Sequence, residues 1–118
     1  MFVVKSMKHI PYHSIDWSFI ESTSVAGETG FCLSKTLNFG SIRIRLLEYS
    51  ANYLADHWCT RGHLVFCLEG EFESHLRSGE VTQLRKGMSY FVSDNKSTHR
   101  SFSKSGAQLL IVEGDFLK

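Results

Sequence analysis

The sequence predicts an antiparallel all-β protein, either a sandwich or a barrel. The first observation is that short runs of β-branched and aromatic residues, from about residue 29 onward, alternate with clusters of Gly, Asn, Asp and Ser. The second is the strict alternation of apolar and polar side chains over residues 41–46, which is typical of a half-buried strand. The third is the run 63–68, which is apolar on both faces and therefore needs cover on both.

The N-terminal segment, residues 1–28, is expected to form an arm or edge segment in front of a barrel made of residues 29–118. Within this segment, residues 15–20 suit either an edge strand or a helical turn, and both assignments stay open. One or two strands are expected within residues 30–39, where the barrel begins.

The first strand with a clear alternation carries Ile42, Ile44 and Leu46 on one face and Arg43 and Arg45 on the other. We expect the apolar face to meet the core and the arginines to meet solvent, because arginine is mostly exposed in folded proteins. The alternative is that the polar face is the inner one, in which case the arginines would hold an anion inside the barrel.

Six further strands are expected, at residues 63–68, 72–76, 81–84, 88–92, 99–103 and 107–112. In the strand at 63–68, one apolar face can look into the barrel. The other must then meet the N-terminal segment or a second subunit, so the sequence predicts a homodimer.

Length and composition favour one ordinary globular domain over residues 1–118. Thirteen Lys and Arg against twelve Asp and Glu give a net charge of +1 with no strongly basic run, so we expect no nucleic-acid partner. No apolar stretch approaches the roughly 18 residues that span a bilayer, and the N-terminus lacks a signal-peptide pattern. We therefore expect a cytoplasmic protein with no membrane partner, and the odd count of three cysteines also favours a reducing compartment.

Four side chains of metal-ligating type stand out: His57, Cys59, His63 and His99. Residues two apart in a strand point to the same side, so His57 and Cys59 can approach one ion together. Residues 60–62 must turn the chain back to bring His63 beside Cys59, and a three-residue hairpin loop with a left-handed Gly62 would do this. His99 opens another strand, and closure of the barrel would bring it to the same point.

These four residues also have metal-free interpretations. They could form a pocket in which the side chains hydrogen-bond one another without an ion. Cys59 alone could be a small buried hydrophobe, or a reactive thiolate flanked by histidines. Cys67 and Cys32 are expected in the core.

The segment His57-x-Cys59-x3-His63, with Gly70 after it and with Gly87 and His99 further on, resembles the two conserved motifs of the cupin superfamily. In this comparison Cys59 stands where the family has its second histidine, and His63 stands where it has a glutamate. Ser93 and Ser103 stand where the second motif has proline and asparagine. The tetrad at residues 56–59, Asp-His-Trp-Cys, is similar to the signature of the small DHCW-motif cupin-fold proteins.

The resemblance implies a cupin double-stranded β-helix, an antiparallel jelly-roll barrel, with one metal ion inside it. Cupins with three histidines and a glutamate typically hold iron, manganese or nickel. Replacing a carboxylate by imidazole and an imidazole by thiolate favours zinc, with iron, nickel or copper as alternatives. The expected ligands of one divalent transition metal are His57, Cys59, His63 and His99.

Three further polar residues accompany the ligands. Asp56 could accept the free N–H of a ligating histidine, or could cap the loop. Ser101 and Ser103 share the parity of His99, so we expect them to line the same pocket.

No general base stands out besides these ligands, so the sequence favours a metal-stabilised binding or sensing module for a small polar ligand, with a closed four-ligand site. One alternative is a metalloenzyme with Lewis-acid, isomerase or dioxygenase-type chemistry, which needs an open coordination position. Another alternative is a metal-free barrel that binds a small ligand.

Overall fold

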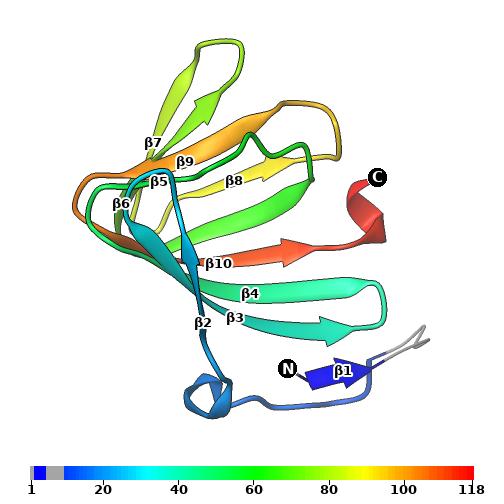
Figure 1. Ribbon diagram of the computed structural model, residues 1–118. Coiled ribbons are helices and arrows are strands. Elements are labelled where there is room, and N and C mark those ends of the chain that lie inside the picture. The colour runs from blue at the N-terminus through cyan, green and yellow to red at the C-terminus, as the bar shows by residue number, and fades with distance from the viewer. Residues whose placement is uncertain (1, 5–9) are drawn as a thin grey trace.

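The computed structural model of the chain describes residues 2–4 and 10–118. Ten strands are found in this part of the chain: β1 (Phe2–Val4), β2 (Thr23–Ala26), β3 (Phe31–Phe39), β4 (Ile42–Tyr49), β5 (Tyr53–Leu54), β6 (His63–Leu76), β7 (Val81–Arg85), β8 (Ser89–Val92), β9 (His99–Ser103) and β10 (Ala107–Glu113). They form one curled sheet in the order β1-β3-β4-β10-β6-β9-β5, with β2 on β3 and with β7 and β8 on β6 (Figure 1). Apart from the parallel pair β1 and β3, neighbouring strands are antiparallel, which confirms the predicted fold class.

The long strand β6 joins the two halves of the curled sheet. Its first half pairs with β10 and β8, and its second half pairs with β7 and β9. The prediction of two separate strands here was wrong, because Gly70 stays within β6 at a φ of +73°. A register shift between Gln108 and Leu109 of β10 absorbs the irregularity. A Cβ at position 70 would collide with the carbonyl oxygen of Gly106, so this crossing requires glycine.

The inner face of β4 is its polar face, which contradicts the prediction that Ile42, Ile44 and Leu46 meet the core. Arg43 and Arg45 share their parity with the buried residues Leu47 and Tyr49. Alternation shows which side chains share a face, but it does not show which face is inside. In this half of the barrel the inner face borders a cavity, where polar side chains are accommodated.

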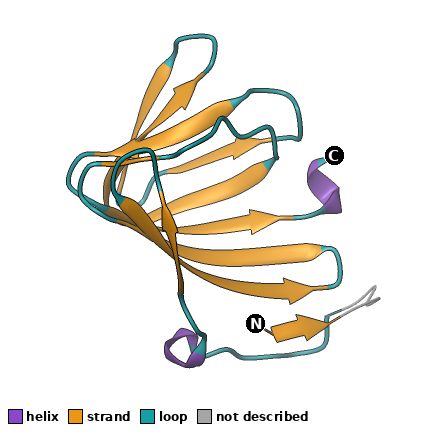
Figure 2. Cartoon of the chain, viewed as in Figure 1, coloured by secondary structure: helices purple, strands orange, loops and turns teal. Residues whose placement is uncertain are grey.

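The described part of the N-terminal segment runs along the edge of β3: β2 pairs antiparallel with residues 31–34, and β1 pairs parallel with residues 37–39. Residues 17–19 form the short 3-10 helix η1 (Trp17–Phe19), so the helical turn is the correct one of the two assignments for this segment. Asp16 caps this turn by accepting from the Ser18 backbone N–H at 2.9 Å. Lys35 of β3 donates to the Trp17 carbonyl oxygen at 2.9 Å. A second 3-10 helix, η2 (Asp115–Leu117), follows β10 near the C-terminus (Figure 2).

The apolar core lies on the inner face of the sheet. It consists of the buried residues Cys32, Leu47, Tyr49, Tyr53, Val65, Cys67, Phe72, Leu84, Ala107, Leu109 and Ile111. The predicted core positions of Cys32 and Cys67 are thereby confirmed, at 5% and 2% exposure. Among the described residues, no helix has the length and hydrophobicity to cross a membrane.

Candidate metal centre

Three side chains from separate segments converge at the wall of the barrel. The possible ligand atoms of Cys59, His63 and His99 all lie within 4.8 Å of one another. Cys59 Sγ is 3.4 Å from His63 Nε2, and the two imidazole rings stand at 78° with their centroids 5.0 Å apart. Both histidines are buried and Cys59 is half-buried, so the cluster is sheltered from bulk water.

Cys59 is held by a single β-bridge to the first residue of β9. Its backbone N–H donates to the His99 carbonyl oxygen at 2.7 Å, and the His99 N–H donates back at 3.0 Å. The prediction of a regular strand through His57 and Cys59 was wrong, because the chain between β5 and β6 is otherwise irregular. The bridge places the Cys59 and His99 side chains next to each other.

The turn from Cys59 to His63 differs from the predicted hairpin, although it does bring these two residues together. Cys59 pairs with β9 rather than with β6, and Gly62 does not have a positive φ. Glycine is needed at position 62 for close approach, because a Cβ there would lie 2.7 Å from the Asp94 backbone nitrogen. The Gly62 N–H donates to the Asp94 carboxylate, which fixes the end of the turn.

In each histidine, a partner at Nδ1 fixes the ring so that Nε2 faces the cluster. His99 Nδ1 lies 2.7 Å from the Ser97 carbonyl oxygen, which can only accept, so Nδ1 carries the proton. His99 Nε2 is then a lone-pair acceptor, and it is buried without a hydrogen-bond partner. His63 Nδ1 lies 3.1 Å from Glu113 Oε2, which leaves Nε2 facing Cys59. Two imidazole nitrogens and one sulfur therefore face a common point, and this donor set fits a transition-metal ion.

The electrostatics of the cluster favour a thiolate at Cys59. Burial acts to raise the pKa of the thiol, but its contacts with His63 and His99 outweigh burial and hold the pKa at about 5. Burial acts to lower the pKa of His63, but its contacts with Cys59 and Glu113 raise it overall. In the absence of an ion, the cluster is thus stabilised as a thiolate beside an imidazolium.

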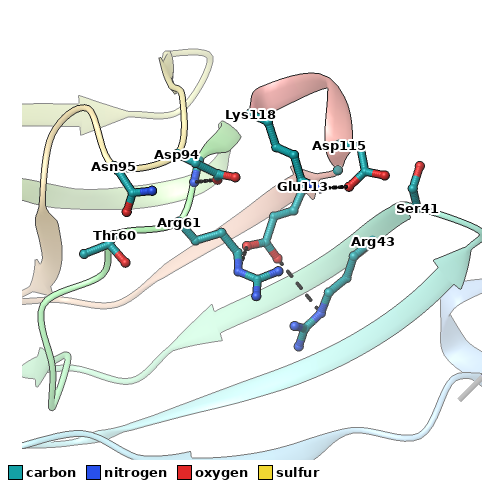
Figure 3. A pocket seen from close by; sticks show the side chains of 11 residues that line it. Ser41, Arg43, Thr60, Arg61, Asp94, Asn95, Glu113, Asp115 and Lys118 are labelled. Carbon is teal, nitrogen blue, oxygen red and sulfur yellow. Dashed lines mark hydrogen bonds and ion pairs between the residues drawn. The ribbon is translucent and has the colours of Figure 1, made fainter.

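Glu113, at the end of β10, is a site residue that sequence reasoning missed. Its side chain is 3% exposed, and its carboxylate lies 3.1 Å from both His63 Nδ1 and Arg45 Nε. The Nε atoms of Arg61 and Arg43 lie 3.7 Å and 3.9 Å from the same carboxylate (Figure 3). Burial acts to raise the pKa of Glu113, but His63 and Arg45 lower it overall, so the group is a carboxylate.

A parity argument could have found Glu113. It continues the alternation of Ala107, Leu109 and Ile111, all of which are buried. A carboxylate at the next buried position of an apolar face requires a charged partner. The arginines of the neighbouring β4 supply one, since Arg43 lies opposite Glu113 in the β4–β10 register.

His57 and Asp56 lie apart from the three-residue cluster. The His57 side chain is 74% exposed, and its Nδ1 lies 2.7 Å from Asp56 Oδ1. Asp56 thus contacts a histidine, though not one of the three clustered residues, and this contact lowers the pKa of its carboxyl group. Both side chains line the same cavity as the cluster.

The two serines have different surroundings. Ser101 lines the cavity, and its hydroxyl lies 3.1 Å from the Tyr49 hydroxyl. The Ser103 hydroxyl donates to the Glu71 carbonyl oxygen at 2.8 Å and accepts from the Gly106 N–H at 3.0 Å. Ser103 therefore holds the turn between β9 and β10, and it does not border the cavity.

The cluster opens onto a cavity of about 390 Å³ inside the curled sheet. The wall combines the three ligand-type side chains with aromatic and cationic groups, among them Tyr49, Tyr53, Tyr90, Arg43, Arg45 and Arg100. A mixed wall of this kind suits a small polar molecule.

Comparisons with solved structures show that the chain has the cupin fold. It is similar to an RmlC-like cupin from Shewanella frigidimarina, with a TM-score of 0.70 and 18% identity over 88% of this chain and 91% of that one. It is also similar to an ectoine synthase from P. lautus (TM-score 0.71, 18% identity, 87% and 78% of the two chains). A sugar phosphate isomerase from a cupin superfamily, from Silicibacter pomeroyi, matches with a TM-score of 0.69 and 14% identity over 86% and 75% of the two chains. No protein-family model matches the chain, and the curated proteins gave no significant match.

Proposed function

We propose that this cupin-fold protein binds one transition-metal ion through Cys59, His63 and His99 and uses it to act on a small molecule in the cavity. The observation that carries the proposal is the convergence of three ligand-type side chains from three segments on the cavity wall. Three protein ligands are the typical number at a catalytic metal, whereas structural zinc sites have four. A bound ion of this kind would polarise a substrate oxygen or lower the pKa of a bound water.

Zinc is the metal that best suits this donor set. Cysteine thiolate and histidine imidazole are both common ligands of zinc in proteins. Iron, nickel and copper also accept imidazole and thiolate ligands, so they are the alternatives to test.

The remaining residues of the site position the ligands and shape the cavity. The Glu113 carboxylate holds the Nδ1 side of His63, and the Ser97 carbonyl oxygen holds the Nδ1 side of His99. The Tyr90 ring packs edge-on against His99 at 5.9 Å between centroids, and burial raises the pKa of its hydroxyl. Tyr90 is therefore a neutral part of the cavity wall.

The second candidate function is a metal-stabilised binding or sensing module, and the position of His57 favours it. His57 lines the same cavity and sits two residues before Cys59 in an irregular segment. A movement of this exposed ring to the ion would close a four-ligand site, as the sequence predicted. The module would then bind its ligand without turnover.

We also propose that the chain is a DHCW-motif cupin-fold protein, on the strength of residues 56–59. All four residues of the tetrad make side-chain contacts in the structure. Asp56 lies against His57, and Cys59 belongs to the metal cluster. Trp58 packs beneath the guanidinium groups of Arg100 and Arg77, at 4.7 Å and 5.6 Å from the ring centroid.

Cobalt substitution separates the enzyme from the binding module. We expect Co²⁺ to give the intense visible spectrum of a four-coordinate thiolate site, with the same spectrum in the His57→Ala variant. Added azide should change the spectrum in both proteins by replacing water at the open position. The closed site would instead be established if the His57→Ala spectrum differs from that of the wild type and if azide leaves the wild-type spectrum unchanged. Absence of Co²⁺ binding would support the metal-free barrel.

A further inference from the structure

The cavity contains a second chemical feature, a pair of inward-facing arginines on β4. Arg43 and Arg45 are two residues apart and line the same cavity as Cys59, His63 and His99. The Arg45 side chain is 22% exposed and that of Arg43 is 42% exposed, so both guanidinium groups are partly withdrawn from water.

These arginines carry more positive charge than the surrounding residues neutralise. Glu113 is the ion-pair partner of Arg43, Arg45 and Arg61, and none of the three has another such partner among the described residues. Arg43 and Arg45, which both line the cavity, share this one carboxylate, so the pair keeps an excess of one positive charge. Figure 3 shows that Arg43 and Arg61 both approach Glu113.

The hydrogen-bonding capacity of the pair is also largely unused. Arg45 makes one hydrogen bond within the described residues, from Nε to Glu113. Arg43 Nε is buried and has no acceptor. A partly buried guanidinium is costly unless an anion pairs with it, and burial together with the neighbouring Arg45 charge lowers the pKa of Arg43. An anion between the two side chains would accept from the unpaired Nε–H and would offset the repulsion between the two partly buried guanidinium charges.

The neighbouring cleft, drawn in Figure 3, does not show the same imbalance. It has a volume of about 320 Å³ and is bordered by the other side of Glu113. Lys118 pairs there with Asp115 at 3.1 Å, and Asp94 accepts from the Gly62 N–H. Arg43 borders both spaces and Arg61 borders the cleft alone, so Arg45 is the arginine that belongs to the cavity side only.

We propose that Arg43 and Arg45 bind the carboxylate or phosphate group of a small anionic substrate beside the metal centre. The planar fork of donors on a guanidinium matches the oxygens of both groups. Glu113 connects the two parts of the site, because one of its oxygens contacts Arg45 and the other contacts His63. A small molecule anchored at the arginines can therefore reach the cluster. The anion site needs no metal, whereas its role as a substrate anchor rests on the proposed function.

Nuclear magnetic resonance of the arginine Nε–H groups tests the anion site directly. Inorganic phosphate and acetate are titrated at constant ionic strength, with neutral acetamide as the comparison. We expect saturable shifts of the Arg43 and Arg45 signals with one or both anions and none with acetamide. The anion that binds more tightly identifies the phosphate or carboxylate class. Absence of saturable shifts at these two residues with either anion would overturn the proposal.

Variants provide the second test. Arg43→Met removes the more exposed of the two arginines, so folding should survive, and we expect anion affinity to fall at least tenfold. Arg85→Met on exposed β7 is the matched control and should bind like the wild type. Equal affinity in Arg43→Met and the wild type would place the anion elsewhere and overturn the proposal.

Metal content of the same proteins separates this inference from the proposed function. Cys59→Ser should lose metal and keep its anion-dependent shifts. Arg43→Met should keep its metal and lose the anion-dependent shifts. Anion binding in a wild type that takes up no metal would support the arginine site and refute the metal centre. Metal uptake without anion binding would refute the arginine site alone.

Discussion

Cys59 illustrates how strongly a residue's chemistry depends on its neighbours in this protein. The three cysteines are Cys32, Cys59 and Cys67, and none is in a disulfide. Burial raises the pKa of Cys32 to about 11 and is the largest cause of the raised pKa of Cys67. Contacts with His63 and His99 reverse this effect at Cys59, where the pKa is about 5. At neutral pH, Cys59 is therefore the thiolate among the three.

We predict that iodoacetamide modifies Cys59 well before Cys32 and Cys67 at pH 7 in chelator-treated protein. The thiolate is the nucleophile, so the rate at Cys59 should fall as the pH decreases through about 5. His63→Ala should slow the reaction at pH 7 by raising the pKa of the thiol. Peptide mass spectrometry over time measures all three rates. Equal rates at the three cysteines would contradict the assignment.

Glu113 stabilises the folded protein through the charge of its carboxylate rather than through the packing of its side chain. We predict that Glu113→Gln destabilises the protein by about 3–5 kcal/mol at pH 7, because it leaves the buried His63 and the partly buried Arg45 without their carboxylate partner. The pKa of Glu113 is lower in the folded state than its ordinary value of 4.5. Its stabilisation is therefore present above pH 4.5 and is lost as the pH falls through the folded-state pKa.

Urea unfolding of wild type and Glu113→Gln between pH 3 and pH 8 measures this difference. Glu69→Gln is the control, because Glu69 forms an exposed pair with Lys86 and should change the free energy of unfolding by less than about 1 kcal/mol. If the difference in free energy of unfolding between wild type and Glu113→Gln increases as the pH falls, the stabilisation does not come from the charge of Glu113.

At the residue scale, spacing in the sequence singled out Cys59, His63 and His99, and the structure brings these three side chains together. It did not place His57, since that depends on whether residues 57–59 form a regular strand. The single bridge at Cys59 depends on β9, forty residues away in the chain. Glu113 was missed because its partners come from other elements.

At the scale of elements, spacing and turn residues predicted most of the strands, and β9 begins and ends where expected. Two errors have clear physical causes. Residues 63–68 and 72–76 were expected to form two strands, but a bulge lets the chain continue through Gly70 as the single strand β6. The inner face of β4 was assigned by hydrophobicity, which fails where a sheet borders a polar cavity instead of a packed core.

Adjacent leucines on β10 test the assignment of inner and outer faces. Leu109 is 1% exposed in the core, whereas Leu110 is partly buried on the opposite face. We predict that Leu109→Ala lowers the free energy of unfolding by about 2–5 kcal/mol, as expected for a buried leucine. Leu110→Ala should cost about 1 kcal/mol. Urea unfolding compares the two variants, and a larger loss for Leu110→Ala would reverse the face assignment.

At the scale of the whole molecule, the resemblance of the motifs predicted the cupin fold, and the structural comparisons confirm it. The state of assembly is a separate question. The outer face of β6 and β8 keeps Phe66 at 39% exposure, Leu68 at 37% and Phe91 at 67%. This exposed apolar surface is where the second subunit expected from the sequence would have to pack.

We predict a homodimer in solution, with a mass of about twice 13.4 kDa by light scattering at micromolar concentration. Phe91→Glu places a charge on the outer face and should shift the protein toward the monomer without changing its metal content. Val81→Glu is the control, since Val81 is also exposed but lies on the β7 hairpin. A monomeric wild type would contradict the prediction.

The central claim is the three-ligand metal centre, and metal content by plasma mass spectrometry tests it most directly. Protein purified without an affinity tag or chelator should contain close to one transition-metal ion per chain, and so should His57→Ala. Cys59→Ser and His63→Ala should contain almost no metal. Their melting temperatures should be lower than that of the wild type, because the ion binds and stabilises only the folded state. A folded wild type without metal, or a loss in His57→Ala as large as in Cys59→Ser, would contradict the account.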